Sequence, residues 1–376
     1  MVQIHGFVAP GFEKVREEFE ANFSERGEVG ASVCVVLSGE TVVELWGGLA
    51  DLESGRPWER DTLVDFYSAG KPLVASLVLR VVDEGLVGLD EPIASIWPEF
   101  AEGGKASATL RHALSHRAGV PAIAATLTNE DLWSWDTMTS ELAATPAWFE
   151  PGSRLVYHTN TYGHLAGEIA RRLTGEMPGT LLGKVASTLG ADVHFGLDDG
   201  DLPRCASVIW DVEHSPAVLP PSEGRPEDSM VLRSYFNPPG YSSFGVVNSA
   251  EWRKAQVPST NGHGTAAGVA AFYAGLLQPG RVLSPAILEE ATRVQAEGDC
   301  PVLGERALFG LGFAPTSSRR PFGPNKGAFG HFGTGGAVGF ADPAASIAFG
   351  YVMNHVIPRW QSTRNRALID ALYANL

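Results

Sequence analysis

The sequence predicts an α/β (α+β) protein with one antiparallel sheet, flanked by N- and C-terminal helices, into which a mostly helical lobe is inserted. Strand-like runs lie near both ends of the chain, and helical patterns dominate the middle. A chain of 376 residues is long enough for two lobes. We expect residues 1–70 and 256–376 to form the lobe with the sheet, and residues 71–255 to form the inserted lobe.

The N-terminal part of the chain begins with a helix and a hairpin. Residues 11–26 carry apolar side chains at helical spacing with charges between them, which predicts an amphipathic helix. Two apolar runs follow at 31–38 and 42–46, and they predict paired strands. The dipeptide Gly39-Glu40 between them predicts a tight turn.

The middle and the end of the chain show the patterns expected for the inserted lobe and for the returning sheet. Apolar periodicity predicts helices over residues 73–85, 107–117, 162–174 and 265–277. The last stretch predicts strands at 328–333, 337–342 and 346–353, and a closing helix over 361–375.

Composition excludes several classes of partner. Acidic residues number 43 and basic residues 28, so the net charge is −15, whereas nucleic acid and anionic membranes need a positive face. The sequence contains no charge-free apolar window of about 18 residues, so no membrane-spanning helix is expected. Cys34, Cys205 and Cys300 are too far apart for a disulfide framework or a metal cluster. Residues 1–23 lack the pattern of a signal peptide, and we expect a cytoplasmic protein.

The strongest local signal is the S-x-x-K motif formed by Ser68 and Lys71, at the start of a long apolar helix. Three residues are almost one helical turn, so the lysine amine can lie beside the serine hydroxyl. A serine needs a base to become a nucleophile, and a desolvated lysine with a depressed pKa can act as one. The helix start also offers N–H groups to a developing negative charge. Taken alone, the motif also fits a capping serine and a surface lysine.

The residues around this motif resemble those of a known family. The segment FYSAGKPLVASLVLRVVDEGLVGLDEPIASIWPEF and the run TLRHALSHRAG at 109–119 resemble the serine β-lactamase and penicillin-binding-protein-like superfamily. Within it, the chain is most similar to the class C β-lactamase-like carboxylesterases known as family VIII, over most of residues 10–375. The resemblance implies the fold of that superfamily and a serine hydrolase that forms a covalent acyl-serine.

The second motif of the superfamily is Y-x-N, which Tyr157 matches at its first position. The resemblance implies that the Tyr157 phenol joins the hydrogen-bond network of Lys71 and relays a proton to the leaving group. Beside a cationic lysine, we expect a phenolate to be accessible. Thr159 stands at the third position and Asn160 one place later. Because the family's asparagine holds the substrate amide of β-lactams, its displacement weakens the β-lactamase interpretation, and both residues remain candidates for substrate binding or support.

The third motif is K-T-G on a strand, and the matching segment is 329–336, in which His331 stands at the lysine position and Thr334 follows Gly333. His331 replaces the lysine and is expected to orient Tyr157 or to polarise the pocket. Gly333 is expected to let substrate approach the strand closely. The resemblance implies that the N–H groups of Ser68 and Thr334 form an oxyanion hole. An unperturbed histidine gains charge as the pH falls from about 8 to about 6. If this charge limits lactam binding, residual β-lactam hydrolysis, corrected for the ester rate, is expected to rise over that range.

Two other kinds of site are weaker interpretations. His112 and His116 have the spacing of metal ligands, but no glutamate lies between them, and structural or capping roles are favoured. A Ser-His-Asp triad would need a G-x-S-x-G turn, and the segment at 240–244 lacks the final glycine. We therefore expect neither a metal nor an organic cofactor.

The sequence thus predicts a serine carboxylesterase that cleaves small-molecule, short-chain esters through an acyl-enzyme. Amide chemistry on the same scaffold stays open, as a β-lactamase, a D-amino-acid peptidase or amidase, or an acyl transferase. A catalytically silent penicillin-binding-like protein is the alternative from a different class. We expect specificity to lie in the loops around residues 120–150 and 205–260.

Overall fold

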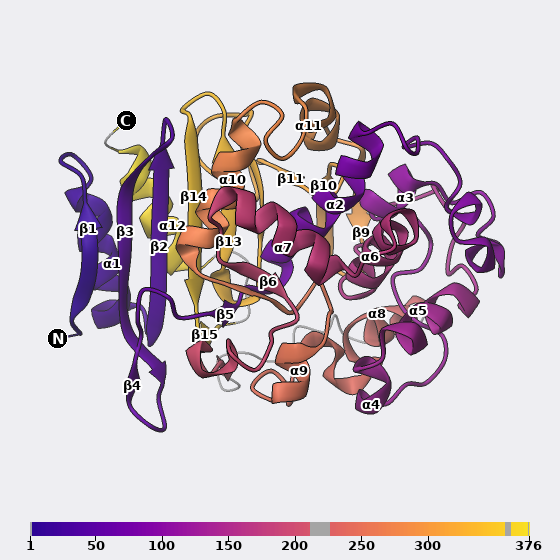
Figure 1. The fold of residues 1–376 in the computed structure, drawn as a ribbon, viewed down its shortest axis with the longest axis horizontal. Helices are drawn as coiled ribbons and strands as arrows, with labels where there is room; N and C mark the ends of the chain where they lie inside the picture. Colours follow the sequence, from indigo (N-terminus) through magenta and orange to yellow (C-terminus); the bar gives the residue numbers. More distant parts are fainter. Residues whose placement is uncertain (1, 211–225, 358–361, 375) are drawn as a thin grey trace.

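The main sheet is antiparallel and joins the two ends of the chain (Figure 1). The computed structural model describes residues 2–210, 226–357, 362–374 and 376, so residues 211–225 of the expected specificity loop lie outside the described residues. In spatial order the strands are β1 (Ile4–Val8), β3 (Glu40–Asp51), β2 (Gly30–Leu37), β14 (Ile347–Met353), β13 (Val338–Asp342), β12 (Phe329–Phe332) and β11 (Ala314–Pro315), with β4 (Arg56–Pro57) paired to β3. In the middle, β2 pairs with β14 and places Val35 opposite Phe349. The predicted fold class is confirmed.

Helices cover both faces of this sheet. They are α1 (Glu13–Glu25), α10 (Ala266–Leu277) and α12 (Thr363–Tyr373). Gly350 lies under α10, where an added Cβ would lie 2.3 Å from the Ala266 carbonyl oxygen. The next residue, Tyr351, points to the opposite face. Its hydroxyl bonds to Glu28, whose carboxylate accepts a hydrogen bond of 2.8 Å from Arg364 of α12. Because α12 packs against α1, these two helices cover the face opposite α10.

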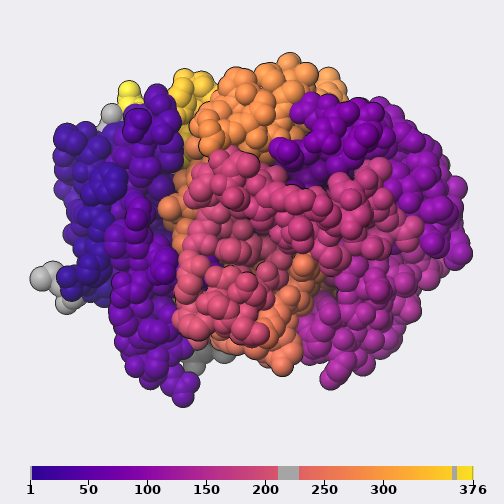
Figure 2. All heavy atoms as spheres, viewed as in Figure 1, coloured from indigo at the N-terminus to yellow at the C-terminus, as the bar shows by residue number. Residues whose placement is uncertain are grey.

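Most of the remaining helices lie to the right of β13 in Figure 1, and α7 (Pro178–Leu189) lies between them and α10. The others are α2 (Lys71–Asp83), α3 (Leu110–Leu114), α4 (Asn129–Leu132), α5 (Trp135–Ala144), α6 (Thr161–Thr174), α8 (Pro226–Phe236), α9 (Ala250–Lys254) and α11 (Pro285–Thr292). Figure 2 shows the indigo and yellow ends of the chain together at the left, and the purple to magenta middle at the right. The division at residues 70/71 and 255/256 stays a prediction.

In the part of the chain that the structure describes, three groups of short strands lie outside the main sheet. They are β5 (Val64–Asp65), β8 (Gly262–Gly264) and β6 (Val193–Phe195) as one group, β9 (Ala296–Cys300) with β10 (Glu305–Phe309) as a second, and β7 (Ile209–Trp210) with β15 (His355–Val356) as a third. Among the described residues, no helix combines the length and the apolar character needed to cross a membrane.

Several elements differ from their predicted bounds, and the strand predicted over 42–46, for example, spans Glu40–Asp51 as β3. The turn between β2 and β3 falls on Ser38 and Gly39, one residue before the predicted pair, because both central residues adopt positive φ, 51° and 89°. The helix predicted over 107–117 spans only Leu110–Leu114. A capping box starts it after Thr109, and His116 leaves the helical conformation with φ 63°.

Candidate active site

Ser68 lies on a tight turn between β5 and α2. Residues Tyr67–Gly70 form a single 3₁₀ turn, and α2 continues from Lys71 with a proline in its first turn, where the missing N–H needs no partner. Tyr67 adopts φ 53°, which is uncommon for a residue other than glycine. The turn places the Ser68 Oγ 2.9 Å from the Lys71 Nζ. The side-chain contact predicted from the S-x-x-K spacing is therefore present.

Lys71 is completely buried and is held by carbonyl groups from two distant segments. Its Nζ donates to the Thr159 carbonyl at 2.7 Å and to the Ser259 carbonyl at 3.0 Å, and both oxygens are neutral acceptors. Burial lowers the pKa of Lys71 well below its ordinary value. This side chain therefore favours the neutral amine, the form that can accept a proton.

Tyr157 lies directly beside this pair. The Lys71 Nζ lies 4.9 Å from the centroid of the Tyr157 ring, and the tyrosine is 1% exposed. Burial raises the pKa of the phenol, and its hydrogen bonding with the Ser68 side chain offsets part of that rise. This differs from the expectation of an accessible phenolate beside a cationic lysine. Burial opposes both charges, which favours a protonated phenol beside a neutral amine.

His331 forms part of the aromatic wall of the site. Its Nδ1 lies 2.7 Å from the Phe332 carbonyl oxygen, and its ring stacks against Tyr157 and Phe309 with centroid separations of 6.2 Å and 6.0 Å. Burial lowers the pKa of His331 to about 3. This pKa removes the basis for the expected rise of β-lactam hydrolysis between about pH 8 and about pH 6, because the ring stays neutral over that range.

Thr159 and Asn160 support the site in different ways. Thr159 contributes its main-chain carbonyl to Lys71. The Asn160 side chain is engaged by the protein itself: its amide nitrogen donates to the Ser234 carbonyl and the Ser242 hydroxyl, both at 2.8 Å, and its amide oxygen accepts from the Thr260 hydroxyl at 2.6 Å. With both ends of the amide occupied, Asn160 braces the loops around the site, and the geometry supports this role over substrate binding.

Gly333 has a different neighbour from the one expected. An added Cβ at this position would lie 2.3 Å from the carbonyl oxygen of Phe66, two residues before Ser68. The glycine therefore lets β12 approach the nucleophile turn, whereas substrate approach was the expected reason. Thr334 follows it, half-buried, at the start of a one-turn helix. The oxyanion hole formed by the N–H groups of Ser68 and Thr334 stays a prediction.

Sequence reasoning missed two contributors to the site. Ser259 supplies a carbonyl to Lys71, and its hydroxyl donates to the Asn160 carbonyl at 2.6 Å. Its only sequence signal is the polar run Ser259-Thr260-Asn261 just before β8. Phe309 stacks on Tyr157 with a centroid separation of 5.4 Å, and no motif marks it.

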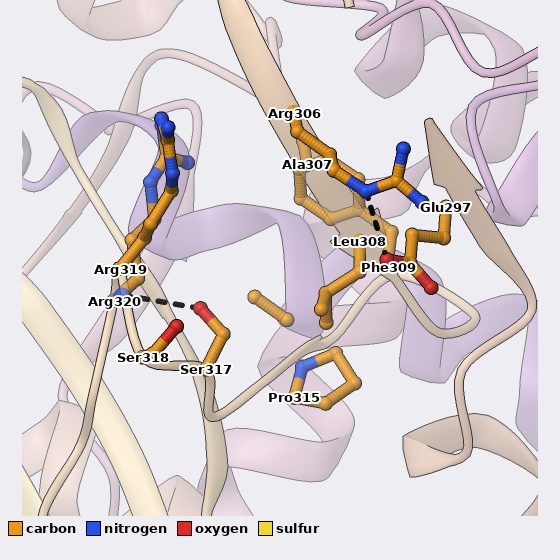
Figure 3. A pocket seen from close by; sticks show the side chains of 11 residues that line it. Glu297, Arg306, Ala307, Leu308, Phe309, Pro315, Ser317, Ser318, Arg319 and Arg320 are labelled. Atoms are coloured by element: carbon orange, nitrogen blue, oxygen red, sulfur yellow. Dashed lines mark hydrogen bonds and ion pairs between the residues drawn. The ribbon is translucent and has the colours of Figure 1, made fainter. Parts of the chain in front are cut away.

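A cavity of about 170 Å³ is lined in part by Phe309 (Figure 3). Arg319 and Arg320 line one wall, whereas Arg306 and Glu297 line the other and bond at 3.1 Å. Arg320 bonds to Glu305, and its charge contributes to lowering the pKa of Tyr157 against the larger effect of burial. The cavity thus shares Phe309 and an electrostatic contact with the site.

The two histidines with metal-ligand spacing have structural contacts. The His112 Nδ1 accepts a hydrogen bond of 3.3 Å from the Thr109 N–H in the capping box of α3. The His116 Nδ1 accepts one of 3.1 Å from the His158 N–H. Within the described ranges, no group of three or more His, Cys, Asp or Glu side chains is arranged to hold a metal ion.

The match to a protein family spans nearly the whole chain. The family model described as Beta-lactamase covers residues 16–374. The chain belongs to the Beta-lactamase family. This membership confirms the resemblance to the superfamily that the three motifs indicated.

Individual relatives show which members of the family this chain is similar to. The esterase/beta-lactamase LipL of Mycobacterium tuberculosis is 31% identical over 370 residues, which cover 94% of this chain and 84% of LipL. A solved family VIII carboxylesterase is 38% identical with a TM-score of 0.91, and both chains are covered completely. A penicillin-binding protein homologue from Caulobacter crescentus is 37% identical with a TM-score of 0.90, again over both full chains. This member of the Beta-lactamase family therefore shares its whole fold with an esterase.

Proposed function

We propose that the chain is a serine carboxylesterase that hydrolyses short-chain esters through an acyl-enzyme on Ser68. The observation that carries the proposal is the 2.9 Å contact between the Ser68 Oγ and the buried Lys71 Nζ. The names of LipL and of the family VIII carboxylesterase support ester hydrolysis. No metal or organic cofactor enters the proposed reaction.

Hydrogen-bond counting around Lys71 supports its role as the base. A neutral amine has two N–H bonds and one lone pair. The carbonyl oxygens of Thr159 and Ser259 can only accept, so they take both N–H bonds. The lone pair is then left for Ser68, whose Oγ lies 2.9 Å away and whose hydroxyl would donate to it once the amine is neutral. As the Ser68 oxygen attacks the ester carbonyl, its proton passes to Lys71.

Tyr157 completes the proton path. Its phenol is protonated at rest and can donate that proton to the oxygen of the departing alcohol. The phenolate that remains recovers a proton from the Lys71 ammonium beside it, which restores both groups. A water molecule in the place of the alcohol reverses these transfers and releases the acid. The N–H groups of Ser68 and Thr334 are proposed to stabilise the oxyanion in both halves of the reaction.

The neutral His331 supports esters over β-lactams as substrates. A β-lactam carries a carboxylate, and a histidine whose pKa is about 3 offers it no positive charge near neutral pH. The name of LipL, which includes beta-lactamase, makes β-lactam hydrolysis the second candidate.

A substrate comparison with a covalent label tests the proposal. Nitrophenyl acetate, butyrate and octanoate are compared with a chromogenic cephalosporin on one preparation, and a fluorophosphonate adduct is mapped by mass spectrometry. We expect fast turnover of the short esters and an adduct on Ser68. Absence of ester turnover, or an adduct on another residue, contradicts the proposal.

A cytoplasmic location is proposed as well. The free buried thiols of Cys34, Cys205 and Cys300 support it, and cell fractionation tests it.

A further inference from the structure

We propose that Asp65 is a positioning residue for Ser68, and that its carboxylate holds the nucleophile turn in the productive geometry only while it is ionised. This inference rests on the proposed function, because it takes Ser68 as the nucleophile. Asp65 is the last residue of β5 and lies three positions before Ser68. It is 1% exposed, and no sequence motif points to it.

The Asp65 carboxylate bonds directly to the turn that carries the nucleophile. Its Oδ1 accepts a hydrogen bond of 2.8 Å from the Tyr67 N–H, and its Oδ2 accepts one of 3.0 Å from the Trp252 Nε1–H. Tyr67 has φ 53°, a conformation that an aromatic residue keeps only when its surroundings impose it. The Tyr67 hydroxyl accepts a further bond of 3.2 Å from the Ser243 hydroxyl. The residue before Ser68 is therefore held at its backbone and at its side-chain tip.

The two partners of Asp65 are both donors, which favours the ionised carboxylate as the holding form. A carboxylate accepts both bonds with lone pairs to spare, whereas a protonated acid adds an O–H that competes with one of the donors. Burial raises the pKa of Asp65 to about 8, against the lowering effects of Tyr67, Trp252 and Arg253. Ionised and protonated forms therefore exchange within the working range of an esterase assay.

The titratable groups that face Asp65 do not change their protonation state over the pH range of such an assay. The pKa of the Tyr67 phenol is raised well above its ordinary value by burial, so it stays neutral. His263, which pairs with Asp65 across β5 and β8, has its pKa lowered to about 3 by burial and also stays neutral. Arg253 on α9 stays cationic. Among these neighbours, the ionisation of Asp65 is the one change between about pH 6 and about pH 9.5.

The test is the pH profile of ester hydrolysis in the wild type and in Asp65→Asn. With nitrophenyl butyrate, kcat/KM of the wild type is expected to rise through a step near pH 8, at the pKa of Asp65. Asp65→Asn is expected to lack that step and to run about tenfold below the wild-type plateau, with kcat changed more than KM. Wild-type turnover with the same step retained in Asp65→Asn overturns this inference alone and assigns the step to another group. A wild type without ester turnover contradicts the proposed function instead.

Two further variants separate positioning from general loss of packing. Ser243→Ala removes the bond to the Tyr67 hydroxyl and should leave the step where it is. Trp252→Phe removes one donor that lowers the pKa of Asp65 and should move the step to higher pH. If Asp65→Asn fails to fold, the Trp252→Phe profile decides: a step at the wild-type position overturns the proposal.

Discussion

The Lys71 amine and the Ser68 hydroxyl are in contact at 2.9 Å, and neither side chain has more than 6% of its surface exposed. Spacing along one helical turn accounts for the contact. Burial accounts for its chemistry, because a desolvated amine loses its proton more easily and then presents a lone pair to the hydroxyl.

Replacing the nucleophile should abolish activity without unfolding the protein. Ser68→Ala removes the atom that forms the covalent bond, and kcat/KM for nitrophenyl butyrate should fall by more than about a hundredfold. The midpoint of thermal unfolding should change little, since the alanine fits the same space. Retention of more than about a hundredth of the wild-type rate in a folded variant would contradict the role of Ser68.

Loss of the base should be as damaging as loss of the nucleophile. Lys71→Ala and Lys71→Arg should both reach the low rate of Ser68→Ala, because a guanidinium stays charged and cannot accept the proton. The double variant with Ser68→Ala should be no slower than either single variant, since the two groups act in one step. A much slower double variant would place them in different steps.

The burial of Lys71 should also appear in the pH dependence of stability. Because the folded-state pKa lies below the unfolded-state pKa of about 10.4, folding at neutral pH expels a proton, and the free energy of unfolding should rise with pH up to that value. Lys71→Met lacks this contribution. Relative to this variant, the wild type should therefore gain unfolding free energy between about pH 7 and about pH 10, measured by urea denaturation. A pH-independent difference would show that burial does not perturb Lys71.

Tyr157→Phe should affect poor leaving groups most. An alkyl alkoxide needs a proton to depart, whereas nitrophenolate leaves without one, so kcat/KM should fall by about a hundredfold more for ethyl butyrate than for nitrophenyl butyrate. The comparison holds the acyl group constant, so packing defects affect both substrates alike. Equal losses would remove Tyr157 from the proton path.

Esters should be favoured over β-lactams by about a hundredfold to about a thousandfold in kcat/KM. The difference reflects about 2.5–4 kcal/mol lost with the absent lysine and the displaced asparagine. Because the pKa of His331 is about 3, this residue should not change the ratio of the two rates between about pH 8 and about pH 6. Lactam efficiency within about tenfold of the best ester would show that neither substitution limits lactam binding.

Gly333→Ala should damage both folding and catalysis. Its Cβ would lie 2.3 Å from the Phe66 carbonyl oxygen and would push β12 away from the nucleophile turn. We expect a loss of about 1–3 kcal/mol in unfolding free energy and of about tenfold in kcat. Gly327→Ala is the matched control, because a Cβ there meets nothing within 4 Å. Similar behaviour of the two variants would argue against a close approach at Gly333.

The sequence by itself determined what depends on local spacing. Hydrophobic periodicity placed the helices and strands of the sheet-bearing lobe, and the three motif segments named Ser68, Lys71, Tyr157 and His331. The local predictions that were wrong include the bounds of elements. Helix α3 is shorter than predicted because His116 adopts positive φ, and the hairpin turn lies at Ser38-Gly39. Such conformations depend on contacts that periodicity does not describe.

The tertiary structure decided the protonation states and the reasons for individual residues. The carbonyls that hold the Lys71 amine come from residues 88 and 188 positions away, and the burial that lowers its pKa is the sum of many such segments. The same burial made His331 neutral and kept the Tyr157 phenol protonated. Asn160 holds the surrounding loops together because three groups distant in sequence form hydrogen bonds with its side-chain amide. Desolvation and long-range hydrogen bonds arise only when the chain is folded, so motif spacing can name the reacting groups but not their charges.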